Sequence, residues 1–160
     1  MRKLYFLFFL AFLPLVASAQ AVEIDGIYYN LNSSGDTKTA EVTENPNKYS
    51  GDIVLPETIT HNDVTYSVTS IGDVAFYQCI GLTSVTIPNS VISVGLSPFE
   101  DCSELTSVVV ESDNPVYDSR DNCNAIIETS TNTLIAGCKR AFTSRTAKSF
   151  SSKIDDGIVV

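Results

Sequence analysis

The chain has 160 residues, and its 19 acidic side chains outnumber its 10 basic ones, which gives a formal net charge of −9 at pH 7. Such a negative field repels phosphate backbones and anionic lipid headgroups, so we expect no nucleic-acid and no membrane-surface partner. The length suits one domain. The absence of Trp and the abundance of Ser, Thr, Val and Ile favour β structure.

Residues 1–19 have the pattern of a secretory signal peptide. Met1-Arg2-Lys3 is basic, Leu4 to Ala17 is almost wholly apolar, and Ala17-Ser18-Ala19 supplies the small residues that a signal peptidase reads. Cleavage is expected before Gln20. The apolar run is shorter than the roughly 20 residues of a membrane-spanning helix, so an uncleaved anchor or a buried helix is the weaker alternative and the mature chain should have no transmembrane segment. The sequence predicts a secreted or cell-surface protein.

Residues 20–52 are expected to form an N-terminal β-hairpin. Residues 22–29 and 39–43 alternate between apolar and polar side chains, and they flank the polar, glycine-containing segment Asn32–Asp36. A hairpin here would cover the first exposed coil of the repeats that follow, as the terminal caps of solenoids do.

The middle of the chain repeats itself with a period of 23 residues. Leu82-Thr83-Ser84-Val85 recurs unchanged as Leu105-Thr106-Ser107-Val108. The same offset relates further apolar and cysteine pairs, namely Ile71 and Val94, Phe76 and Phe99, and Cys79 and Cys102. Repeats of this length are typical of solenoids, in which each coil buries its apolar edge against its neighbours.

Within a coil, the spacing of apolar residues predicts one short strand. Val85 and Ile87 should point inward, and Ser84 and Thr86 outward, because side chains alternate along a strand. Pro88 has no N–H to donate and should end the strand. Gly72 and Gly95 are expected at bends, where the absence of a Cβ is useful.

A partial coil precedes the two full ones. Ile53–Ile59 resembles Val85–Val91 position for position, 32 residues upstream, so an insertion of about nine residues separates it from the next coil. Inside this insertion His61-Asn62-Asp63 is a polar turn, followed by the alternating strand Val64–Val68. The predicted fold is therefore a mainly β, short solenoid over residues 53–139.

After the second coil, residues 123–129 and 133–138 predict another inserted hairpin, with Ser130 and Thr131 as its turn. Cys123 and Cys138 would then face each other across the strands, and an exported protein is free to oxidise them, so both a disulfide and free thiols remain open. For Cys79 and Cys102, at equivalent positions of adjacent coils, free thiols are favoured over a bridge. No obvious cap follows the second coil.

No group of residues predicts catalysis, so we expect no enzyme, no cofactor and no metal. His61 lies in a polar turn without the nucleophile and orienting group of a catalytic triad. Asp113, Asp118 and Asp121 lie along one loop, which leaves calcium as an alternative, but the Gly and bidentate Glu of an EF-hand loop are missing. Solvated turn acids are the favoured interpretation.

For binding, the candidates are the outward strand positions. Solenoids commonly recognise partners across such aligned strands, although a solvated face without a partner is an equal alternative. The candidate binding residues are Ser84, Thr86, Ser107, Val109 and Glu111.

The segment Ile71–Val91 resembles the BspA-type leucine-rich repeat, I-G-x-x-A-F-x-x-C-x-x-L-x-x-I-x-I-P-x-x-V. The second coil departs from this pattern, because Pro98 replaces the alanine and Glu111 replaces the proline. The resemblance covers roughly residues 53–138. It implies an exported or surface-attached bacterial protein, as in mouth and gut anaerobes, and a protein or cell-surface ligand such as a host matrix protein. It implies no shared catalytic residue.

From Arg140 the repeat pattern is lost, and residues 140–160 are expected to be an irregular tail. Thr143–Ala147 can be encoded by a DNA sequence that reads Ile-Pro-Asn-Ser in another frame, which suggests a frameshift or truncation. The leading hypothesis is an adhesion or protein-binding module. A non-functional remnant of a longer surface protein is the second hypothesis, and an exported hydrolase is the third and weakest.

Overall fold

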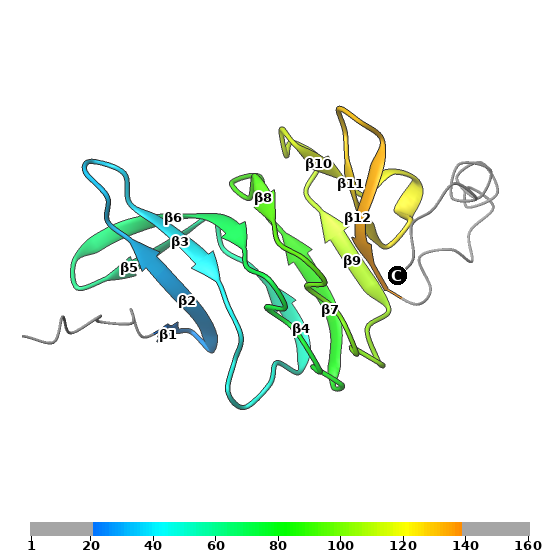
Figure 1. The fold of residues 1–160 in the computed structure, drawn as a ribbon, viewed down its shortest axis with the longest axis horizontal. Coiled ribbons are helices and arrows are strands. Elements are labelled where there is room, and N and C mark those ends of the chain that lie inside the picture. Colours follow the sequence, from blue (N-terminus) through cyan, green and yellow to red (C-terminus); the bar gives the residue numbers. More distant parts are fainter. Residues whose placement is uncertain (1–20, 139–160) are drawn as a thin grey trace, which may run out of the picture.

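The computed structural model describes residues 21–138, and these form a mainly β fold, as the sequence predicts (Figure 1). The predicted signal peptide, its cleavage before Gln20 and the irregular tail over 140–160 lie outside the described residues. Within these described residues there are three sheets, which we name the front, back and end sheets. Figure 1 shows the back sheet toward one end of the molecule and the end sheet at the other.

The front sheet consists of three parallel strands, one from each successive coil. They are β4 (Gly51–Val54), β7 (Leu82–Ile87) and β9 (Ser107–Val110). Val85 pairs with Val108, which is the predicted 23-residue offset, and Ile53 pairs with Val85, which is the predicted 32-residue offset. The repeats therefore stack in register.

The back sheet extends a second ladder with the N-terminal strands. Its members are β1 (Val22–Ile24), β2 (Ile27–Asn32), β3 (Thr39–Val42), β5 (Thr58–His61), β6 (Val64–Ile71) and β8 (Ser93–Val94). The parallel ladder at its centre pairs Val42 with Ile71 and Ile71 with Val94, so three coils contribute to it. The coil geometry thus begins upstream of Ile53, while the cap role of residues 20–52 stays a prediction.

Two of the predicted hairpins are present in the back sheet. β2 and β3 are antiparallel around the polar segment, and β5 and β6 are antiparallel around Asn62 and Asp63. The first arm of the predicted N-terminal hairpin, residues 22–29, is divided into β1 and β2, because Asp25 and Gly26 form a tight turn with positive φ angles of 51° and 81°. An Asp-Gly pair is well suited to such a two-residue turn.

The end sheet contains the late hairpin. It consists of β10 (Tyr117–Asp118), β11 (Ala125–Glu128) and β12 (Thr133–Gly137), with a 3₁₀ turn over Arg120–Asn122 between the first two. Ala125 and Ile126 are buried in the same core as the coils. The expectation that nothing caps the second coil is therefore wrong, because this sheet packs against the outer side of β9.

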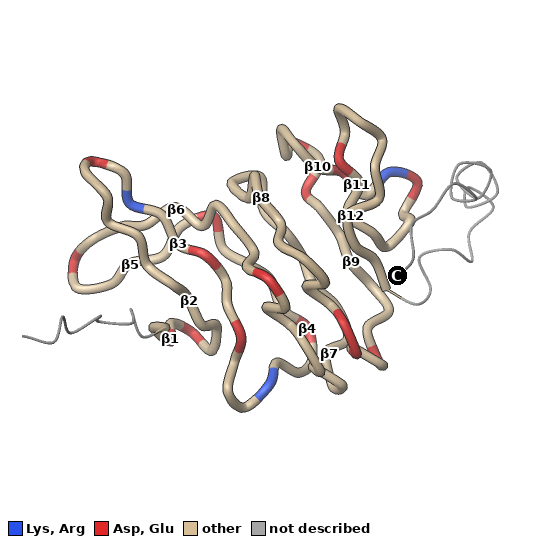
Figure 2. The backbone as a smooth tube through the Cα atoms, viewed as in Figure 1, with Lys and Arg blue, Asp and Glu red and all other residues tan. Residues whose placement is uncertain are grey.

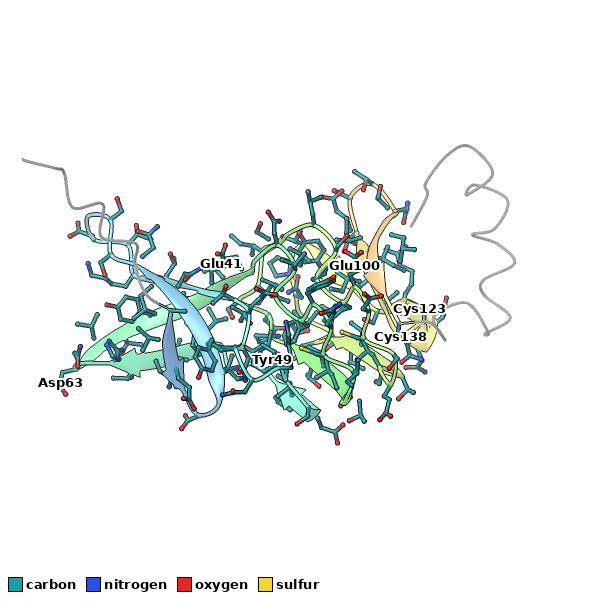
Figure 3. All side chains as sticks on the ribbon, turned by 60° about the horizontal axis from the view of Figure 1, so that its bottom comes forward. Glu41, Tyr49, Asp63, Glu100, Cys123 and Cys138 are labelled. Carbon is teal, nitrogen blue, oxygen red and sulfur yellow. The ribbon has the colours of Figure 1, made fainter. Side chains whose placement is uncertain are left out.

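A bulge corrects the predicted pairing of Cys123 with Cys138. Near the turn Glu128 pairs with Thr133, as predicted, but the register shifts by one between Ile126 and Ile127. The Cys138 N–H therefore donates to Asn124 O at 3.2 Å. Cys123 and Cys138 lie unbridged at the end sheet (Figure 3), and the choice between a disulfide and free thiols in the exported protein stays open.

The core is an apolar column between the front and back sheets. The Phe76 ring lies 5.3 Å from that of Phe99 and 4.9 Å from that of Tyr49, centroid to centroid. Leu82 and Leu105 are buried in the same cluster. The predicted stacking of coil on coil around one interior is confirmed, and Tyr49 (Figure 3) adds an aromatic ring from the first coil.

Gly95 is required by close packing between coils. A Cβ at this position would lie 2.5 Å from Asp73 N and 2.7 Å from Gly72 C. The φ angle of Gly95 is not positive, so, contrary to the prediction from the sequence, glycine is not needed here for the backbone freedom of a bend. It is needed because the neighbouring backbone leaves no space for a Cβ.

Candidate binding surface

The outward side chains of the front sheet lie in two rows, because its three strands are parallel and in register. The polar row consists of Asp52, Ser84 and Ser107. The mixed row consists of Val54, Thr86 and Val109. Figure 1 shows β4, β7 and β9 side by side, so the rows cross the sheet at right angles to the strands.

Asp52 is the fixed charge of the polar row. Its Oδ1 accepts hydrogen bonds from Ser84 Oγ at 2.6 Å and from Thr83 Oγ1 at 2.7 Å. These two donors lower the pKa of the Asp52 carboxyl, so it stays ionised through the neutral range. Both bonds fall on one oxygen of this exposed residue, so Oδ2 accepts no hydrogen bond from residues 21–138.

The mixed row presents apolar surface to water at both edges of the sheet. Val54 on β4 is 65% exposed, and Val109 on β9 is 43% exposed. Thr86 lies between them on β7 and is partly buried. An ordered surface that combines exposed apolar groups with a fixed charge can contribute both area and orientation to a protein interface.

The structure brings four of the five predicted binding residues together in these rows: Ser84, Thr86, Ser107 and Val109. Glu111 lies beyond the end of β9, and its Oε2 accepts the N–H of Asn89 at 3.3 Å. Asp52 and Val54 were missed, although the 32-residue offset from Ser84 and Thr86 was sufficient to find them. The binding role of all these residues stays a prediction.

Cys79 and Cys102 are stacked thiols inside the coils. Cys102 Sγ donates to Phe76 O at 2.9 Å, and Cys79 Sγ accepts the N–H of Tyr49 at 3.3 Å. The neighbouring Cys102 thiol, with the Tyr49 N–H, lowers the pKa of Cys79, while Cys79 and burial raise the pKa of Cys102. Both thiols are free and almost completely buried. Each one bonds to a residue of the preceding coil, so the two hydrogen bonds link successive coils.

The remaining ionisable residues do not converge. His61 lies at the end of β5, next to the Asn62-Asp63 turn, and Figure 3 shows Asp63 at the tip of this hairpin. Asp118 is bonded by Arg120, whose guanidinium lowers the pKa of the Asp118 carboxyl. Within residues 21–138, no three or more His, Cys, Asp or Glu side chains gather as a metal site would require.

The described part of the chain is more acidic than the whole. Residues 21–138 contain 17 acidic and 3 basic side chains, the latter being Lys38, Lys48 and Arg120. Figure 2 shows the acidic positions spread over all three sheets. Lys48 pairs with Glu44 at 3.5 Å and Arg120 pairs with Asp118. The field of this region therefore favours basic partners.

The sequence model of the BspA type Leucine rich repeat region (6 copies) matches residues 56–152, well over half of the chain. The chain belongs to the BspA-type leucine-rich-repeat family. The match continues past residue 139, where the visible pattern ends. Members of leucine-rich-repeat families are typically protein-interaction modules.

Solved structures of bacterial leucine-rich-repeat proteins are also similar to this chain. A cell surface protein of Faecalibacterium prausnitzii is 32% identical with a TM-score of 0.49, and the match covers 61% of this chain and 25% of that one. A protein of Bacteroides ovatus is 31% identical with a TM-score of 0.47, over 57% and 24%. One of Bacteroides capillosus is 29% identical with a TM-score of 0.49, over 57% and 66%.

This BspA-type chain therefore spans about a quarter of the length of the first two of these proteins.

No curated protein matches it. Residues 21–138 contain no helix with the length and apolarity that crossing a bilayer requires.

Proposed function

We propose that this BspA-type chain is an exported protein-binding module that attaches to a protein of a cell surface or host matrix through the front sheet. The observation that carries the proposal is the in-register alignment of β4, β7 and β9, which places a polar and a mixed row on one ordered, exposed face. The apolar side chains of Val54 and Val109 are exposed on this face, where a bound partner would bury them.

Export is supported by the signal-peptide pattern of residues 1–19, and adhesion by the membership of the repeat family. The function proposed is recognition alone.

The test is binding of the purified chain to an array of extracellular-matrix proteins and to intact bacterial and host cells. Thr86→Arg places a large charged side chain at the centre of the front sheet and should weaken binding to any positive array member at least about tenfold. Ser93→Arg is the matched control, because Ser93 is exposed on β8 in the back sheet. Equal binding by both variants, or no binding by the unmodified chain, would contradict the proposal.

A further inference from the structure

Among the strands that the structure describes, none pairs with the outer edge of β4, and this edge is open. β7 has a strand on each side, and the outer edge of β9 is bonded to Ser119, whose Oγ accepts the N–H of Val110 at 2.9 Å. Among the described strands β4 pairs with β7 alone. An unpaired strand edge is a template for adding another strand.

The backbone groups that face outward from this edge can be assigned. Gly51 N donates to Gly81 O and Leu55 N donates to Thr86 O, so these two residues turn their backbone groups toward β7. Backbone direction alternates along a strand, so the N–H and C=O groups of Asp52 and Val54 point away from the sheet. Both residues are exposed.

The side chains of the same two residues lie on the outward face. A strand added to β4 would place two of its own side chains, two positions apart, opposite Asp52 and Val54. The Asp52 carboxylate is already oriented by Ser84 and Thr83, and its Oδ2 is free to accept from a cation. Val54 offers an apolar neighbour that is 65% exposed.

We propose that the open edge of β4 binds an extended basic peptide segment of a partner protein by strand addition, with Lys or Arg opposite Asp52 and a small apolar residue opposite Val54. This inference rests on the proposed function and specifies its partner. Charge decides the occupant: residues 21–138 of a second copy would bring another 17 acidic and 3 basic side chains to the same edge, whereas a basic segment is attracted.

The probe is a fluorescein-labelled peptide, Thr-Val-Thr-Lys-Thr-Val-Thr, which presents valine two positions from lysine in either strand direction. Its anisotropy should rise on titration with the full chain. The same peptide with Glu at its centre should not bind, because it would oppose the Asp52 carboxylate. Failure of the lysine peptide to bind, or equal binding of both peptides, would overturn the proposal.

Backbone pairing is tested with two further peptides that are N-methylated at alternate residues. Only one alternating set of N–H groups faces the strand that is being extended, so one pattern should abolish binding and the other should preserve it. Equal affinity of the two methylated peptides would show that the peptide does not pair as a strand.

The protein variants locate the site. Asp52→Asn keeps an oxygen for Ser84 and Thr83 but removes the charge, and it should weaken binding of the lysine peptide about two- to fivefold. Asp63→Asn, which removes the same charge at the exposed tip of the β5–β6 hairpin, should leave it unchanged. If Asp63→Asn weakens binding as much as Asp52→Asn, the peptide responds to the overall charge and not to the β4 edge, and the edge proposal fails.

The two proposals fail in different ways. Array binding that is lost in Thr86→Arg, together with no binding of the lysine peptide, would overturn the edge site alone. Peptide binding that is sensitive to Asp52→Asn, together with no binding to any array member or cell, would support the edge site and contradict the proposed adhesion function.

Discussion

At the scale of single residues, the spacing between coils leaves no room at Gly95. The backbone of the preceding coil occupies the space that a Cβ of Gly95 would need. Asp73 Oδ1 lies at the same place and accepts the N–H of Leu96 at 2.7 Å. Gly95→Ala should therefore lower the free energy of unfolding by about 2 to 4 kcal/mol, because backbone atoms cannot move aside as a flexible side chain can. Urea denaturation measures this loss.

Gly81→Ala is the matched control. A Cβ at Gly81 would meet only Ser50 Cβ at 3.4 Å, which is ordinary contact. This substitution should change the free energy of unfolding by less than about 1 kcal/mol. Similar losses in the two variants would show that close packing of the coils is not the reason for glycine at position 95.

At the scale of elements, Ser119 attaches the end sheet to the last front strand. Its Oγ accepts from Val110 N at 2.9 Å and donates to Ala125 O at 2.7 Å, so one hydroxyl joins β9 to β11. Ser119→Ala leaves the Val110 N–H unpaired, which costs about 1 to 3 kcal/mol. Hydrogen exchange should accelerate at Val110 and in β11.

Ser130, exposed in the β11–β12 loop, supplies the control for Ser119. Ser130→Ala should leave the exchange of the Val110 amide unchanged. Exchange that is unaltered in Ser119→Ala as well would show that the end sheet is held by its apolar contacts alone, through Ala125 and Ile126.

Local signals in the sequence predict the elements better than they predict the contacts between elements. The β5–β6 hairpin follows from Asn62 and Asp63, whose side chains tolerate the positive φ of the turn. The parallel pairing of β3 with β6 joins Val42 to Ile71, and no local pattern predicts such a distant partner. The register shift at Ile126 could not be predicted either, because the turn residues indicate where the hairpin bends but not which residue of its strands is left unpaired.

The candidate surface was predictable where the repeat is regular. The 23-residue period places Ser84 beside Ser107 and Thr86 beside Val109 without any structure. The offset places Ser84 beside Asp52, but the second bond to Asp52, from Thr83, could not be predicted, since Thr83 lies where the register shifts between Gly51 and Asp52. The open edge of β4 was also hidden, because it depends on which strands find no partner.

At the scale of the whole molecule, stability depends on the interfaces between coils. Tyr49, Phe76 and Phe99 form a column, and only Phe76 contacts a ring on both sides. In a solenoid the free energy of unfolding is approximately the sum of coil and interface contributions, so the middle ring belongs to two interfaces and the last ring to one.

Phe76→Ala should therefore cost about 3 to 5 kcal/mol, the usual loss for a fully buried phenylalanine. Phe99→Ala, its repeat equivalent, should cost less, because Phe99 stacks on one ring and is 8% exposed. Urea denaturation of both variants, followed by circular dichroism, compares the two losses directly. A loss for Phe99→Ala that equals or exceeds the loss for Phe76→Ala would show that the coils do not share the column as a common core.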